Sequence, residues 1–160
     1  MASDTPRVES LTMLVFDLFQ THGALVRFGD HFAGSVGLSS SSWQILGAIA
    51  RGQGQVTVPQ IARRMGYARQ SIQRQVNNFV DRGLVELRDN PNHRRSKGLE
   101  LSEAGGQLYA EVGTRWSKWV AQNADAPSVH DVEEARRVLA VLREAMALPP
   151  THFRTPPKGS

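Results

Sequence analysis

Side chains that can bind nucleic-acid bases and phosphates are concentrated in two short stretches of the sequence. The first stretch comprises Ala68, Arg69, Gln70, Ser71, Gln73 and Arg74, and the second comprises Asn92, His93, Arg94, Arg95 and Lys97. Arginine can bond a guanine edge through two donors, and glutamine can bond an adenine edge through one donor and one acceptor. If the fold brings the two stretches to one surface, that surface is suited to contact double-stranded DNA.

The distribution of charge along the chain favours the same kind of partner. The 160 residues carry a formal net charge of +4. Residues 51–100 hold ten basic and four acidic side chains, whereas the rest of the chain holds nine basic and eleven acidic ones. A basic middle between mildly acidic ends indicates a polyanionic partner for the middle alone. An arginine-rich surface that is merely solvated is the alternative reading of the charge.

Several other functions are disfavoured by what the sequence lacks. Without cysteine there are no disulfides, thiolate metal sites or thiol-based redox sensors. The five histidines are scattered, so we expect no metal site. There is no glycine-rich phosphate loop and no HExxH motif, so we expect neither an enzyme nor a bound cofactor. No apolar run reaches the roughly 18–20 residues of a membrane span, and the polar N-terminus does not resemble a signal peptide, so we expect a cytoplasmic protein.

The elements that would position the two basic stretches follow from the apolar spacing. Apolar residues recur at helical spacing in an N-terminal helix over 8–36 and in C-terminal helices over 102–148. Disordered tails are predicted at 1–7 and 149–160. Residues 38–101 between these outer helices form a separate lobe. Hydroxyl side chains are placed to cap its helices and the later ones, at Ser39–Ser42, Thr57, Ser102 and Ser128.

The lobe has the layout of a winged helix-turn-helix. One helix ends at Gly66, where glycine permits the positive φ of a tight turn, and a second helix follows over about 68–82. Ala62 is small enough to let the second helix approach the first closely. Two short strands then flank a long basic loop over about 84–101. The predicted fold class is therefore mainly α with a small β-hairpin wing.

Four segments carry a more specific pattern, namely Val58–Gly66, Ser71–Val85, Asn90–Lys97 and Leu101–Gly105. In these segments the sequence resembles the MarR family of bacterial transcriptional regulators, and the similar layout extends over about residues 8–147. The resemblance implies a homodimer whose N- and C-terminal helices interleave with those of the partner to form an all-α base. It also implies a pseudo-palindromic DNA operator, with the helix over 68–82 in the major groove and a wing arginine, Arg94 or Arg95, in the minor groove.

The resemblance further implies a repressor that a small molecule, often aromatic and anionic, releases from DNA. Such a ligand would bind between the dimerisation base and the DNA-binding lobe. The candidate pocket residues are His22, Phe28, His31, Trp43 and Trp116. For each of these residues, ordinary packing in the core is the alternative role. A winged helix that contacts only another protein, without operator binding, is the alternative function.

Overall fold

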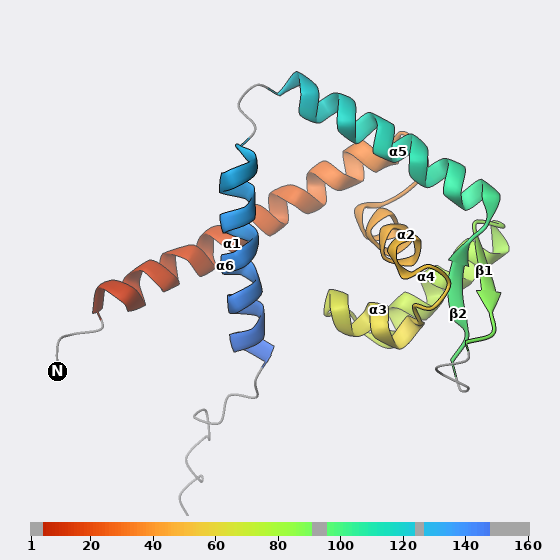
Figure 1. Ribbon diagram of the computed structural model, residues 1–160, viewed down its shortest axis with the longest axis horizontal. Coiled ribbons are helices and arrows are strands. Elements are labelled where there is room, and N and C mark those ends of the chain that lie inside the picture. Colours follow the sequence, from red (N-terminus) through yellow and green to blue (C-terminus); the bar gives the residue numbers. More distant parts are fainter. Residues whose placement is uncertain (1–4, 91–95, 124–126, 148–160) are drawn as a thin grey trace, which may run out of the picture. The chain divides into compact units, whose positions relative to one another are not determined.

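The computed structural model describes residues 5–90, 96–123 and 127–147, and it is mainly helical with one two-stranded antiparallel hairpin (Figure 1). The predicted fold class is confirmed. The chain forms two compact units, Met1–Ser117 and Lys118–Ser160. The predicted DNA-contacting residues Asn92, His93, Arg94 and Arg95 lie outside the described residues, as does the tail from 148 to 160.

The elements follow one another in the order expected of a winged helix with outer helices. They are α1 (Thr5–Gly34), α2 (Ser40–Gly52), α3 (Val58–Met65), α4 (Arg69–Asp81), β1 (Val85–Arg88), β2 (Gly98–Leu101), α5 (Glu103–Gln122) and α6 (Val129–Ala147). Helix α1 begins three residues before the predicted start at residue 8. Residues 5–7 are therefore helical, where a disordered tail was predicted.

The core lies between α2, α3, α4 and the hairpin and includes Ala33 of α1 and Val112 of α5, all within the first unit (Figure 1). Its largest fully buried side chains are Phe79, Ile45, Leu46, Ile49, Ile61, Ile72, Leu99, Val76 and Val112. On α4, Ile72, Val76 and Phe79 are spaced three and four residues apart, so they share one face of the helix. Burying each such side chain contributes about 1.5–3 kcal/mol. This packing fixes which face of α4 points outward.

Most helices in the described ranges begin with a side-chain cap. Ser39 Oγ accepts a hydrogen bond from the Ser42 N–H at 3.1 Å. Thr57 and Gln60 form a capping box, in which the Thr57 N–H donates to Gln60 Oε1 at 2.9 Å. Ser128 Oγ accepts from the Asp131 N–H at 3.2 Å. These caps satisfy backbone donors that the first turn of a helix leaves without partners.

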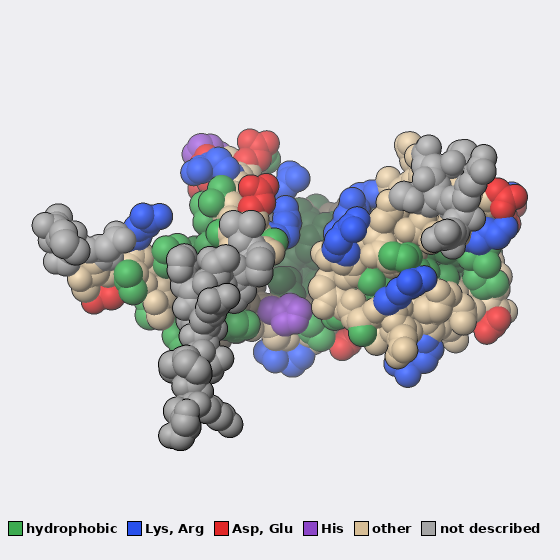
Figure 2. All heavy atoms as spheres, turned by 90° about the horizontal axis from the view of Figure 1, so that it is seen from below, with side chains coloured by type: hydrophobic (Ala, Val, Ile, Leu, Met, Phe, Trp, Pro, Cys, Tyr) green, Lys and Arg blue, Asp and Glu red, His purple; other side chains and the backbone are tan. Residues whose placement is uncertain are grey.

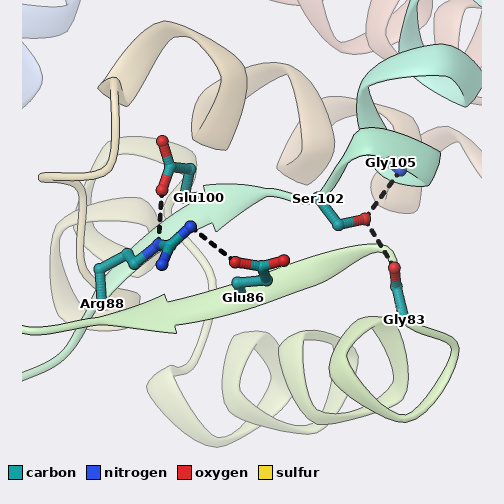
Figure 3. A network of polar contacts seen from close by, with 6 residues as sticks. All are labelled: Gly83, Glu86, Arg88, Glu100, Ser102 and Gly105. Atoms are coloured by element: carbon teal, nitrogen blue, oxygen red, sulfur yellow. Dashed lines mark hydrogen bonds and ion pairs between the residues drawn. The ribbon is translucent and has the colours of Figure 1, made fainter.

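The hairpin is tied to α5 by Ser102. Strand β1 pairs with β2 in the register Val85↔Leu101 to Arg88↔Gly98. The Ser102 hydroxyl donates to the Gly83 carbonyl at 2.6 Å and accepts from the Gly105 N–H at 3.0 Å (Figure 3). One side chain therefore caps α5 and also holds the turn between α4 and β1.

The outer helices leave apolar side chains exposed. On α1, Met13, Phe16, Phe19 and Leu25 are each more than half exposed. Helix α6, taken by itself, has no buried residue, although Val132, Leu139 and Met146 recur along it. Among the helices that the structure describes, none is both long enough and apolar enough to cross a membrane.

Candidate nucleic-acid interface

The outer face of α4 carries the first stretch of predicted contact residues. Arg69, Gln70, Ser71, Gln73 and Arg74 are all exposed. They lie opposite the buried apolar face because the helix repeat places the two sets on different sides. The Gln73 amide donates to Asn77 Oδ1 at 2.9 Å, one turn further along. The face therefore presents guanidinium and amide groups, and within α4 the only acidic residue is the last, Asp81.

The turn before α4 sets the angle at which this face is presented. Gly66 has a φ of 68°, a conformation that glycine adopts without steric cost, and its N–H donates to the Ala62 carbonyl. The N-cap residue of α4 is Ala68, which provides no side-chain hydrogen bond. The positive end of the α4 dipole and its first-turn N–H groups are consequently not covered by a side-chain cap.

A hollow of about 180 Å³ joins the two predicted stretches, and we call it the groove hollow. It is lined by Val58, Pro59, Arg69, Gln73, Leu87, Ser96, Lys97 and Leu99. Residues from the start of α3, the outer face of α4 and the hairpin therefore meet on one surface. Of the predicted residues, this hollow brings together Arg69 and Gln73 from α4 with Lys97 from the wing.

The stem of the wing is anchored to the segment 54–56. The buried Asn90 side chain donates from Nδ2 to the Gln55 carbonyl at 2.8 Å, and the Leu99 N–H donates to the Val56 carbonyl at 2.9 Å. Gly98 lies so close to the Gly54 carbonyl oxygen that any Cβ at this position would collide with it. Sequence reasoning missed Asn90, because its partner lies 35 residues away and no local pattern marks the pair.

Two ion-pair groups order the exposed side of the wing. Lys97 bonds Asp89 across the base of the loop, and this hydrogen bond and the lysine charge lower the pKa of Asp89. Arg88 bonds Glu100 through Nε and Glu86 through Nη2, each at 2.7 Å (Figure 3). The hydrogen bond to Glu100, and then the charges of both acids, raise the pKa of Arg88. Arg88 is therefore neutralised within the wing, although it belongs to the basic middle of the chain.

The space-filling view agrees with a basic outer surface on the lobe. On the face shown in Figure 2, Lys and Arg side chains are spread across the winged-helix lobe, while Asp and Glu side chains lie toward its margins. A surface of this kind attracts phosphate groups and repels basic partners.

The residues predicted to form a ligand pocket are only partly brought together. Phe28, Trp43 and Trp116 belong to one aromatic cluster with Phe32, and ring centroids within it are 5.4–6.2 Å apart. His22 and His31 are exposed, and the sequence pattern did not reveal the central position of Phe32. These rings come from α1, α2 and α5 and contact one another. Within the described residues, no group of three His, Asp or Glu side chains could hold a metal ion.

Comparison with known proteins places these features in a family. The model of the MarR family matches residues 36–96. The uncharacterized protein Rv2011c of Mycobacterium tuberculosis is 39% identical over 107 residues, which span 67% of this chain and 73% of that protein.

Two solved structures share the fold. One is described as a MarR family transcriptional regulator from Listeria monocytogenes complexed with 26mer DNA. It has a TM-score of 0.71 and 20% identity, and the match covers 83% of this chain and 88% of that one. The other is CouR from Rhodococcus jostii bound to p-coumaroyl-CoA. It has a TM-score of 0.69 and 23% identity, with 81% and 90% of the two chains covered.

Proposed function

Because the chain belongs to the MarR family, whose members are transcription regulators rather than enzymes, we propose that it is a cytoplasmic, homodimeric, sequence-specific DNA-binding regulator. The main support for the proposal comes from the residues that line the groove hollow. This hollow gathers Arg69 and Gln73 of α4 with Lys97 of the wing on one basic surface. The Listeria neighbour with the same fold was solved with DNA.

In this proposal α4 enters the major groove of the operator. Arg69 and Gln70, in its first turn, read base edges, while Ser71, Gln73 and Arg74 contact bases or phosphates nearby. The uncapped start of α4 at Ala68 faces a phosphate, whose charge suits the positive end of the helix dipole. The wing residues Asn92, His93, Arg94, Arg95 and Lys97 contact the adjacent minor groove and backbone.

The dimer is supported by the exposed apolar side chains of the outer helices. Phe16 and Phe19 on α1 and Leu139 on α6 are exposed in the single chain, and a second copy would bury them. A two-fold dimer presents two α4 helices to successive major grooves. The operator is then a pseudo-palindrome with half-sites about 10 bp apart.

Release from DNA is proposed to follow ligand binding beside the aromatic cluster, so that the protein acts as a repressor. Aromatic rings suit an aromatic ligand, and CouR, which shares the fold, was solved with p-coumaroyl-CoA. A ligand that binds more tightly to dimers with mismatched α4 spacing shifts the population away from the DNA-bound form.

Footprinting upstream of the protein's own gene tests operator binding directly. We expect a protected pseudo-palindrome at low salt, and no protection at any position would contradict the proposal and favour a protein-binding winged helix. Arg94→Ala and Arg95→Ala then compare the two wing arginines as DNA contacts. The variant that loses a contact should bind DNA more weakly and lower the slope of log affinity against log salt by about one.

A further inference from the structure

A second, larger hollow lies on the lobe and shares no residue with the groove hollow. Its volume is about 490 Å³, and we call it the arginine hollow. It is lined by Arg51, Gly52, Gln55, Val56, Gln60, Arg63 and Arg64. None of these residues is acidic, and the volume falls within the roughly 300–1,000 Å³ of small-molecule sites.

The local sequence explains why three guanidinium groups surround this hollow. On α3, Gln60, Arg63 and Arg64 are spaced three and four residues apart, so they share one face of the helix. The other face is buried through residues such as Ile61 and Ala62. Arg51 comes from the last turn of α2, where a cation is favoured by the negative end of the helix dipole.

These three arginines differ from the paired arginines of the same chain. Arg88, Arg115 and Arg137 each bond a carboxylate at 2.7–2.8 Å. Within the part of the chain that the structure describes, neither an ion pair nor a hydrogen bond joins the side chains at 51, 63 and 64 to a partner. The nearby acid Glu100, beside Gly54, is already bonded to Arg88.

We propose that the arginine hollow binds a compact oxyanion, the phosphate or carboxylate group of a small molecule. Guanidinium groups bond such oxyanions through two parallel N–H donors, and these charge-assisted bonds are stronger than neutral ones. A concave site with three uncompensated arginines suits a small polyanion that several donors can surround. A DNA backbone, in contrast, is more readily met by side chains on a protruding surface.

The site lies against the segment that holds the wing. Gln55 and Val56 line the hollow, and their carbonyls accept the hydrogen bonds from Asn90 and Leu99 that anchor the wing stem. An anion bound here therefore lies against the segment that anchors the wing stem. Any effect of this anion on operator affinity depends on the proposed function, whereas the binding of the anion does not.

Isothermal titration of the free, full-length protein with pyrophosphate and with citrate tests the site in the absence of DNA. We expect saturable binding of one of the two anions, with one site per chain. The double variant Arg51→Gln/Arg63→Gln should weaken that binding at least tenfold. Arg63→Lys keeps the charge but loses the two parallel N–H donors of the guanidinium group, so it should weaken binding less. No saturable binding of either anion overturns the proposal.

The matched control is Arg136→Gln/Arg143→Gln on α6, which also removes two exposed arginines. Both arginines line a hollow on α6 that shares no residue with the arginine hollow. Binding should be unchanged in this variant, and an equal loss there would overturn the proposal by showing a general charge effect. Circular dichroism checks that each variant is folded.

Binding to operator duplexes of two lengths tests whether the phosphate in the hollow belongs to a small anion or to DNA that flanks the operator. If Arg51 and Arg63 serve DNA instead, the double variant loses affinity only for the longer duplex and no small anion saturates the protein. That result overturns the proposal. If pyrophosphate binds but no operator is found, the arginine hollow stands and the proposed regulator function fails.

Discussion

Helices α4 and α6 both carry apolar residues at helical spacing, yet only α4 buries its apolar face within the chain. Ile72, Val76 and Phe79 of α4 are essentially inaccessible to solvent. Leu139 of α6 is 40% exposed, and none of the residues described in α6 is buried. Similar sequence patterns therefore lead to different degrees of burial, because burial depends on what packs against the helix.

This contrast divides the molecule into a part that buries its apolar face within one chain and a part that does not. The winged-helix lobe has its own core and presents a fixed outer face. The outer helices expose apolar area that costs free energy in water, about 25 cal/mol for each Å². We expect the stability of α4 to be independent of protein concentration and that of α6 to depend on it.

The largest effect is expected from Phe79→Ala in the core under α4. Removing a buried phenylalanine side chain costs about 3–5 kcal/mol through lost burial and the cavity left behind. Urea denaturation followed by circular dichroism measures this loss. The neighbouring Val80 is 36% exposed, so Val80→Ala should cost much less. Equal losses for the two variants would show that the buried face of α4 is wrongly assigned.

On α6, the corresponding change is Leu139→Glu. If a second copy covers this face, a charge there should weaken the dimer by about 2–4 kcal/mol, as at interface hot spots. Sedimentation equilibrium measures the dimer dissociation constant. Glu144→Ala, which changes an exposed polar residue of the same helix, serves as the control and should leave the constant nearly unchanged. A monomeric wild-type protein at every concentration would contradict the expected dimer.

The exposed faces of α4 and α6 should also differ in their contribution to operator binding, and this effect is smaller than the two above. Arg69→Ala on α4 should reduce operator affinity by about 1–3 kcal/mol and relax the preference at one base of each half-site. Arg143→Ala on α6 removes the same charge from a surface outside the groove hollow. Fluorescence anisotropy with operator variants compares the two. If both arginines matter equally and without base preference, α4 does not read sequence.

The starts of the two helices should respond in opposite directions to changes of their caps. Ser128→Ala removes the cap of α6 and should destabilise the protein by about 1 kcal/mol. Ala68→Ser offers α4 a cap that it lacks and should stabilise the lobe by up to about 1 kcal/mol. Thermal denaturation measures both. A destabilising Ala68→Ser would mean that the backbone at residue 68 does not allow a side-chain cap.

The smallest effects concern exposed ion pairs, Asp89–Lys97 in the wing and Glu134–Arg137 on α6. In each pair the hydrogen bond and the opposite charge lower the pKa of the acid below its ordinary value, 3.8 for Asp89 and 4.5 for Glu134. A lowered pKa means that the pair stabilises the fold above the ordinary value, and that this stability is lost as the pH falls through the lowered one.

Carboxyl NMR titration measures the two pKa values directly. Lys97→Met should return the pKa of Asp89 toward 3.8, and high salt should shrink both shifts because the groups are exposed. An unchanged pKa of Asp89 in this variant would mean that Lys97 is not its partner in solution.

Local patterns were sufficient to predict much of the fold. Helical periodicity identified the buried side of α4, and the hydroxyl at Thr57 and the glycine at 66 marked the ends of α3. These features depend on residues close together in sequence. The exposed outer face at Arg69 and Gln73 followed from the same periodicity, because whatever does not face the core faces solvent.

The remaining features depend on residues brought together only by folding. Asn90 bonds a carbonyl 35 residues away, and Arg88 bonds Glu100 across the hairpin. Phe32 joins Trp43 and Trp116 because three helices converge there. No spacing rule links these pairs, so their roles could not be predicted without the hairpin register and the helix packing.

The uncapped start of α4 has a consequence for anyone who engineers this protein for robustness. A screen for higher melting temperature would favour a serine or aspartate at position 68, because either would satisfy the open N–H groups. An aspartate there would place a negative charge where the proposed function needs a phosphate. The more heat-resistant protein would then be the poorer regulator, and selection on stability alone would discard the activity without disturbing the fold.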